Sequence, residues 1–294
     1  MSQNQQPQFL DVQRLVQESE PVRRGGWLWY ALALMGMMVI LSSLARSQAP
    51  AGAGTIELVS SIAMLALLAG SMYVMFNAAR AVQREQQRLE AIQELIQLRR
   101  WSDAAAMIEH MLSGPTQTPQ GRFQALVFLA TVLARYHRFH DAVELYERLL
   151  NIEGLDPASS HGLKLGRAMS LLRDDRLYDA DRAIVDLRRG GAGVSAGLEL
   201  VEIYRDVKTG HPQDALERFD RQLGMLKRAL GCRTADAWGL VAGAKLMLGD
   251  APGAQRTWQA ATALVPAVEL VRRYPELSGV SQACAAAAMP QEAA

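Results

Sequence analysis

The residues best suited to chemistry in this sequence are its histidines, which are few and scattered. Only His137 and His140 lie close together, with Asp141 directly after them. Imidazole and carboxylate groups are common metal ligands. These three fall at an expected turn between two helices, where three ligands rarely converge on one ion. We therefore expect helix capping and solvation here, with no bound metal or other cofactor.

Enzyme motifs are missing from the sequence as well. It contains no phosphate-binding glycine loop, no G-x-S-x-G and no H-E-x-x-H, patterns that mark particular catalytic sites. Cys232 and Cys284 are far apart and form no C-x-x-C pair, so neither a zinc ribbon nor a disulfide framework is indicated. We expect a protein that is not an enzyme, with an unrecognised catalytic site as the less favoured alternative.

Composition restricts the partners. The 294 residues carry a formal net charge of +1, whereas a nucleic-acid binder shows a clustered basic excess. We therefore expect no nucleic-acid partner. The mean hydropathy is close to zero because two apolar stretches near the N-terminus are averaged with a polar remainder. That remainder is long enough for one substantial domain or a repeat array.

The two apolar stretches predict a membrane hairpin. Residues 27–44 and 58–76 contain no charged side chain, and each is close to the ~20 apolar residues that a helix needs to cross a bilayer. A cleaved signal peptide is the competing interpretation of the first stretch, but the apolar core of a signal peptide is usually ~7–15 residues long.

Arginines set the expected orientation. They flank both outer ends of the hairpin, and excess arginine marks the cytoplasmic side, so we expect a multi-pass integral protein of the cytoplasmic (inner) membrane with both termini in the cytoplasm. Arg80, Arg84 and Arg88 recur every four residues and share one helix face. They would contact lipid head groups, or serve simply as flanking charge.

Before the hairpin, a short amphipathic stretch is visible. Phe9, Val12, Leu15 and Val16 fall on one side of a possible helix. This helix would lie on the membrane surface or dock onto the soluble domain.

A repeating pattern begins after residue 84. An alanine followed four positions later by a bulky apolar residue recurs at intervals of about 35–39 residues, and periods in this range mark stacked helical repeats. The five pairs are Ala104 with Ile108, Ala142 with Tyr146, Ala180 with Ile184, Ala215 with Phe219, and Ala254 with Trp258.

These residues resemble the tetratricopeptide repeat family, in which each repeat is two antiparallel helices. The last copy is the most similar, through Trp238, Ala242, Gly249, Ala254, Trp258, Ala261 and Pro266. The resemblance covers about residues 84–267. The layout of two spans followed by repeats is similar to that of bacterial membrane-anchored members. The resemblance implies an α-solenoid and says little about function, because the family serves many roles.

The expected fold is therefore all-α, with an N-terminal two-helix transmembrane hairpin followed by a TPR-like solenoid of about five helix-turn-helix repeats. The expected parts are a cytoplasmic segment (1–26), the hairpin (27–79, with spans at about 27–45 and 57–77), the repeat domain (80–275, ending in a capping helix at 267–275) and a disordered tail (276–294).

In this family the first helix of each repeat lines the inner face. Aligning the repeats on their alanines places a basic column beside an apolar column, which suits an extended peptide with acidic and hydrophobic residues. The competing interpretation is that the cations only complement the C-terminal ends of their helices. The expected groove residues are Val127, Thr131, Arg135, Leu165, Met169, Arg173, Tyr204 and Lys208.

The leading prediction is a membrane-anchored scaffold or adaptor that recruits or assembles partner proteins at the cytoplasmic face of the membrane. The alternative is an accessory subunit of a membrane or envelope-biogenesis enzyme complex that contacts its partner through the transmembrane helices.

Overall fold

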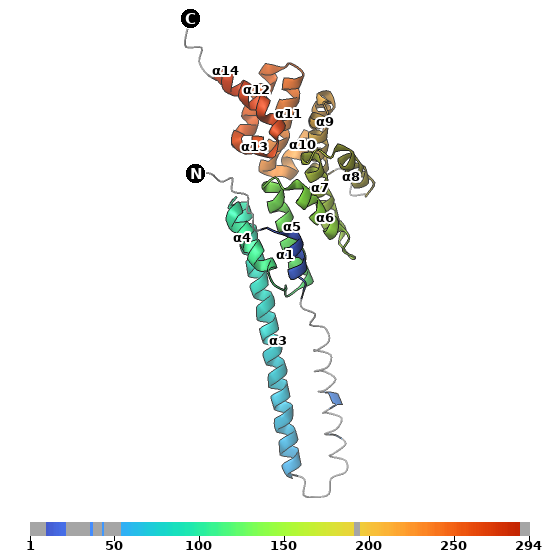
Figure 1. Ribbon diagram of the computed structural model, residues 1–294, viewed down its shortest axis with the longest axis vertical. Coiled ribbons are helices and arrows are strands. Elements are labelled where there is room, and N and C mark those ends of the chain that lie inside the picture. The colour runs from blue at the N-terminus through green and yellow to red at the C-terminus, as the bar shows by residue number, and fades with distance from the viewer. Residues whose placement is uncertain (1–9, 22–35, 38–42, 44–53, 191–194, 289–294) are drawn as a thin grey trace. The chain divides into compact units, whose positions relative to one another are not determined.

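The structure is a computed structural model that describes residues 10–21, 36–37, 43, 54–190 and 195–288 (Figure 1). Over these residues the regular elements are all helices, which confirms the all-α class. The chain divides into two compact units, Met1–Leu129 and Ala130–Ala294, with the boundary inside helix α5 (Pro119–Arg135).

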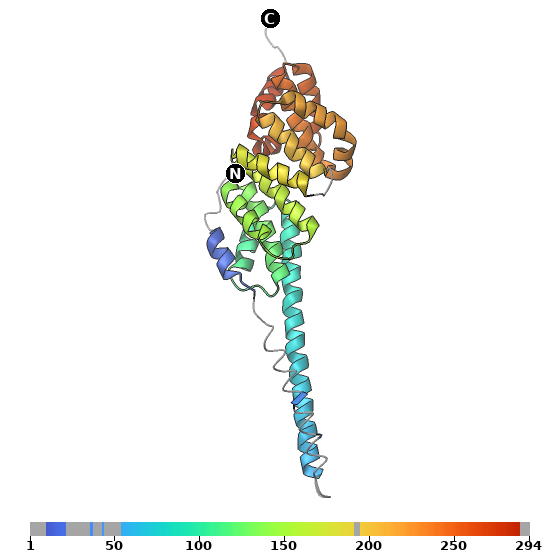
Figure 2. The same ribbon diagram turned by 90° about the vertical axis from the view of Figure 1, so that its right-hand side faces the viewer.

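The first unit contains α1 (Val12–Glu18), α3 (Gly54–Gln97), α4 (Trp101–Leu112) and the start of α5. Helix α3 is long and uninterrupted (Figure 2), because no proline occurs in it and its second half is rich in strong helix formers. Its last turns pack against α4.

The membrane hairpin expected at residues 27–79 is not supported. In the part of the chain that the structure describes, no helix is long and apolar enough to cross a membrane. This finding contradicts the expected localisation as a multi-pass integral membrane protein. Most of the first expected span, residues 27–45, lies outside the described residues.

The short amphipathic stretch near the N-terminus docks onto the first unit. Leu10, Val12 and Leu15 are buried, and α1 packs against α4. The side chain of Asp11 caps α1 by accepting from the backbone N–H groups of Gln13 and Arg14. Of the two alternatives, docking is therefore the correct one; Phe9 lies outside the described residues.

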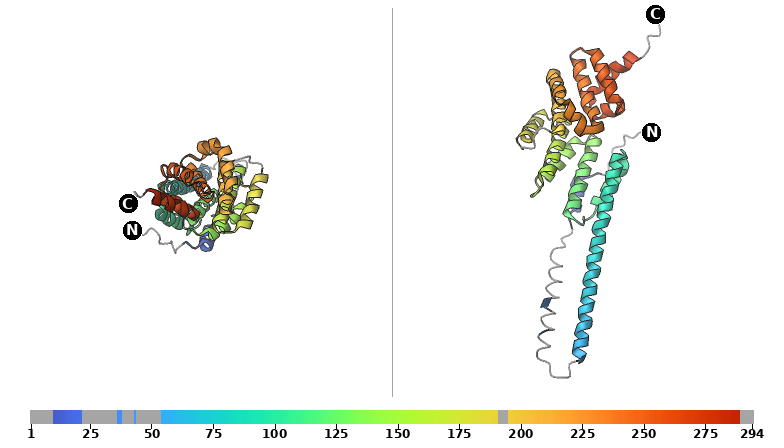
Figure 3. Two further views of the ribbon diagram at one scale, coloured as in Figure 1. Left: turned by 90° about the horizontal axis from the view of Figure 1, so that it is seen from above. Right: turned by 180° about the vertical axis from the view of Figure 1, so that it is seen from behind.

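The second unit continues with further helices, which pack largely with their neighbours in sequence. They are α6 (Phe139–Leu150), α7 (Pro157–Arg173), α8 (Leu177–Arg189), α9 (Ala196–Lys208), α10 (Pro212–Leu230), η1 (Gly231–Arg233), α11 (Thr234–Met247), α12 (Ala251–Thr262), α13 (Ala267–Arg273), η2 (Pro275–Leu277) and α14 (Ser278–Ala288). Helices α7 and α8, α9 and α10, and α11 and α12 form helical hairpins (Figure 3).

The turn before each repeat alanine has the same geometry in all five copies. One residue adopts a positive φ of 59° to 81°, and the next N–H bonds to the carbonyl five residues earlier at 2.8–3.0 Å. This is the Schellman motif that ends a helix. The residues with positive φ are Arg99, His137, Asp175, Gly210 and Gly249.

The repeat alanines let neighbouring helices approach closely. All five are 0–2% exposed. Tyr146, which follows one of them, packs so tightly against α7 that a Cβ added at Gly166 would lie 2.6 Å from its ring. Alanine and glycine are needed at such contacts because a larger side chain would separate the two helices.

The segment expected to be a disordered tail is helical as far as Ala288. The capping helix expected at residues 267–275 corresponds to α13, but η2 and α14 then follow it. Leu277 and Val280 are buried, and the alanine run of α14 is a strong helix former. Burial of two apolar side chains therefore orders the stretch. Residues 289–294 lie outside the described residues.

Candidate peptide-binding face

The expected basic column lies on one side of the second unit, which we call the inner face. It is defined by Arg135, Arg173, Tyr204 and Lys208. The three cations occupy the last turns of α5, α7 and α9. The inner face is covered by the end of the same chain, residues 267–288, which we call the C-terminal segment. Its side chains contact all four residues.

The first contact is an ion pair. Nη2 of Arg135 donates to Oε2 of Glu269 at 3.0 Å, and both side chains are only 11% exposed. The other carboxylate oxygen of Glu269 accepts from Nε of Arg273 at 3.2 Å, and Nη1 of Arg273 donates to the buried Asp236 of α11 at 2.8 Å. These interactions fix α13 against the ends of α5 and α11.

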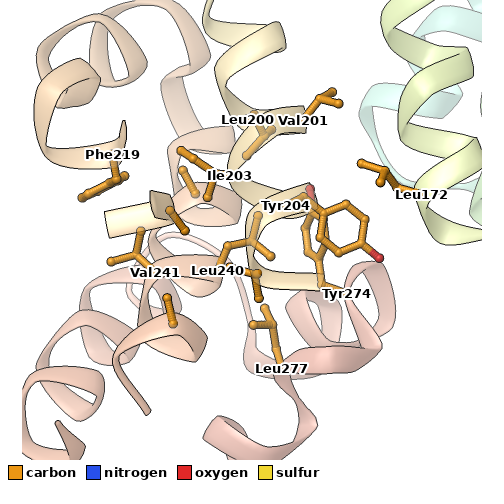
Figure 4. Close-up of a cluster of buried hydrophobic side chains, with 14 of the residues drawn as sticks. Leu172, Leu200, Val201, Ile203, Tyr204, Phe219, Leu240, Val241, Tyr274 and Leu277 are labelled. Carbon is orange, nitrogen blue, oxygen red and sulfur yellow. The ribbon is translucent and has the colours of Figure 1, made fainter. Parts of the chain in front are cut away.

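The second contact is aromatic. The ring of Tyr274 meets that of Tyr204 edge-on, with 5.0 Å between centroids (Figure 4). The guanidinium of Arg173 lies 5.1 Å from the Tyr274 ring and 6.0 Å from the ring of Phe139. Burial raises the pKa of Tyr274 to about 12. The middle cation of the column is therefore neighboured by aromatic rings.

The third contact is a shared carboxylate. Oε1 of Glu276 accepts from Nζ of Lys208 at 2.8 Å and from the hydroxyl of Tyr204 at 3.0 Å. Lys208 also pairs with Asp175 at 2.8 Å. Burial lowers the pKa of Lys208, but the bonds to Asp175 and Glu276 outweigh it and the pKa is raised. Burial, then the charge of Glu276, raises the pKa of Tyr204.

The fourth contact is a leucine side chain packed against α11. Leu277 is fully buried beside Leu240 (Figure 4). A Cβ added at Gly239 or Gly243 of α11 would lie 3.1 Å from its methyl carbons. The two glycines are one turn apart and leave a shallow depression on α11 that accepts a branched side chain.

The remaining expected groove residues lie nearby or elsewhere. Leu165 and Met169, on α7 before Arg173, are half-buried against the core; a Cβ added at Gly197 of α9 would lie 2.8 Å from Leu165. Thr131 bonds to the side chain of Tyr146. Val127 is half-buried and belongs to the first unit.

The occupant of the inner face comes from the same chain. Its acidic and aromatic side chains contact Arg135, Arg173 and Lys208, and it is a short helix followed by a 3-10 turn rather than an extended peptide. Each of the three cations also lies in the last turn of its helix. Sequence reasoning missed Glu269, Tyr274 and Glu276, although their acidic and aromatic types complement the column.

The other candidate residues do not form a site. Arg80, Arg84 and Arg88 are exposed on α3, where Arg80 lies 4.1 Å from the ring of Phe76. Their expected lipid contact depended on the membrane placement and is not carried forward.

The turn with two histidines has a structural role. His137 has a positive φ and packs edge-on against Phe139 at 5.4 Å, while His140 is exposed. Among the described residues, no group of three or more histidine, cysteine or acidic side chains is arranged to hold a metal ion.

A buried ionic cluster connects α8, α9 and α10. Arg218 pairs with Glu199, Glu202 and Asp206, and Arg188 pairs with Glu202 at 2.5 Å. Burial and the neighbouring Glu202 raise the pKa of Glu199. Each of the three acids faces Arg218, so the cluster holds the helices together.

Comparisons of this chain with protein-family models, curated proteins and solved structures found no match.

Proposed function

We propose that this chain is a scaffold or adaptor that binds a segment of a partner protein on its inner face. The proposal includes a tetratricopeptide-type solenoid in residues 84–267. The five matching helix ends and the buried alanines support this, because a regular stack of helical hairpins presents an extended recognition surface.

One observation carries the proposal. Arg135, Arg173 and Lys208 all contact one acidic and aromatic segment. Grooves of helical proteins bind short helices through anchors of this kind. A surface that selects this chemistry in its own chain can select it in a partner.

The proposal concerns protein binding alone. The accessory-subunit alternative required transmembrane helices to make the contact, and the described residues contain no helix suited to span a membrane.

The test is site-specific photocrosslinking in cells of the full chain, with p-benzoylphenylalanine at Met169 or at Tyr178. Met169 precedes Arg173 on α7, whereas Tyr178 is 76% exposed on α8 and serves as the control. A second protein should crosslink to position 169 and not to position 178. Crosslinks to other proteins from position 178 alone would refute the proposal.

A charge reversal then tests the column itself. Lys208→Glu should remove the crosslink, since the variant repels an acidic partner. Arg135→Glu is less suitable, because it would place two nearly buried carboxylates together at Glu269 and unfold the site.

A further inference from the structure

The C-terminal segment has more polar contacts than a cap requires. Leu270, Tyr274 and Leu277 alone would cover the apolar ends of the helices, since all three are fully buried. The segment nevertheless adds two carboxylates, Glu269 and Glu276, each matched to a cation of the inner face.

Such ion pairs affect which segment the inner face binds more than they affect the stability of the fold. Desolvating two charges offsets much of their attraction, whereas a wrong partner leaves one charge buried and unpaired. Arg135 and Lys208 are each 11% exposed, so a segment without carboxylates at these two places would be rejected. The inner face therefore distinguishes between sequences.

The fit of the segment is incomplete at its centre. The hydroxyl of Tyr274 and Nε of Arg173 are both buried, and within the described residues neither has a hydrogen-bond partner. A buried polar group without a partner costs stability. A ligand with a phenyl ring at the position of Tyr274 would avoid part of that cost, so the segment is not the tightest possible occupant.

We propose that residues 269–277 are a built-in ligand that has the chemistry of the partner and is displaced by it. The partner's segment would form a short helix and a turn. It would carry a carboxylate, an aromatic ring, a second carboxylate and a leucine at the spacing of Glu269, Tyr274, Glu276 and Leu277. This inference rests on the proposed function and names the class of partner.

The experiment measures binding of fluorescent peptides to the full chain by anisotropy. The first peptide has the sequence of residues 267–281, the second has Phe at the position of Tyr274, and the third has Lys at both glutamate positions. The proteins are wild type, the double variant Glu269→Gln/Glu276→Gln, and Tyr274→Ala. The double variant keeps the side-chain shape, and Tyr274→Ala vacates the aromatic position.

The first peptide should bind the double variant about tenfold more tightly than wild type, because the competing segment is weakened by roughly 1.4 kcal/mol. It should bind Tyr274→Ala at least as tightly as the double variant, because that substitution weakens the segment more. The second peptide should bind a few-fold more tightly than the first. The third should not bind any of these proteins, but a Lys208→Glu chain should prefer a peptide with Lys in place of Glu276, which would establish the pairing by charge exchange.

Two results would overturn the inference. One is failure of the first peptide to bind either variant while circular dichroism shows both to be helical. The other is a doubled mass in light scattering of the variants together with lost peptide binding, since a second copy of the chain would then supply the segment. If Tyr274→Ala does not fold, peptide binding to the double variant alone tests the inference.

Failure of this inference differs from failure of the proposed function. Peptide binding in vitro without inner-face crosslinks in cells would leave the ligand chemistry standing and remove the scaffold role. Crosslinks to position 169 in cells without peptide binding in vitro would support the scaffold role and remove the built-in ligand.

Discussion

The two ends of the described chain both pack back onto their own units, but they are held by different groups. At the N-terminal end most bonds are to backbone carbonyls: Nη2 of Arg122 donates to the carbonyl of Val16 at 2.7 Å, and the hydroxyl of Thr116 donates to the carbonyl of Ser19 at 3.0 Å. One side chain also takes part, because Nε of Arg122 donates to the hydroxyl of Ser19 at 3.2 Å. At the C-terminal end, side chains meet side chains, as in the pairs of Glu269 with Arg135 and Glu276 with Lys208.

This difference separates packing from recognition. Every residue has a backbone carbonyl, so contacts to carbonyls hold a helix end without selecting its sequence. Contacts to carboxylates and aromatic rings are made only by particular residues. This contrast supports the proposed recognition role of the inner face, whereas the docking of α1 is packing.

The largest expected effect is at Tyr274. Tyr274→Ala should lower the free energy of unfolding by about 3–5 kcal/mol, because it leaves a cavity in the core. Tyr274→Phe should be neutral or stabilising, because it removes a buried hydroxyl that has no hydrogen-bond partner among the described residues. Urea unfolding of both variants measures this. Equal losses from Ala and Phe would mean that the hydroxyl is needed.

A smaller effect is expected at the N-terminal end. Arg122→Ala should cost ~1.5–3 kcal/mol locally, since charged donors make the stronger hydrogen bonds, and hydrogen exchange of residues 10–19 should accelerate. The matched control is Arg14→Ala, which removes only an exposed pair with Glu18 and should leave exchange unchanged. If Arg14→Ala accelerated the exchange of residues 10–19 as much as Arg122→Ala, the docking of α1 would also depend on its own side chains.

The smallest expected effect is a pH dependence that arises at His137, in the turn between α5 and α6. Burial, followed by the charges of Arg135, Arg173 and Arg272, lowers the pKa of His137. The folded chain then binds fewer protons than the unfolded chain. Stability is complete above the ordinary pKa of ~6.5 and is lost as pH falls through the lowered value.

The variant that tests this pH dependence is His137→Asn, because asparagine tolerates the positive φ at this position. Unfolding midpoints of wild type and variant, measured between pH 5 and 7.5, should differ in slope, with wild type losing more on acidification. Parallel slopes would assign the pH dependence to other groups. The hydrogen bonds that Arg122 donates to Val16 and Ser19 should not respond over this range, because arginine stays protonated.

The all-α class was predictable because its signals are local. An alanine and a bulky residue four positions apart identify one face of one helix, and Gly210 and Gly249 identify helix ends. The same turns at Arg99, His137 and Asp175 were not predicted, because glycine is the residue type that commonly indicates a positive φ. The helical structure of residues 276–288 was also missed. An alanine-rich sequence suggests a flexible tail, and the burial of Leu277 and Val280 is a tertiary contact.

The sequence alone determined that the chain is helical, because helix formation depends on residues within one segment. It also led to the prediction that Arg135, Arg173 and Lys208 form one column, which rests on the spacing of the five alanines. Tertiary structure decided what meets that column. Glu269 is 134 residues from Arg135, and Glu276 is 72 residues from Tyr204. No local pattern encodes such a pairing, because the paired residues meet only after the helices between them have packed. That packing places the C-terminal segment against the ends of α5, α7 and α9.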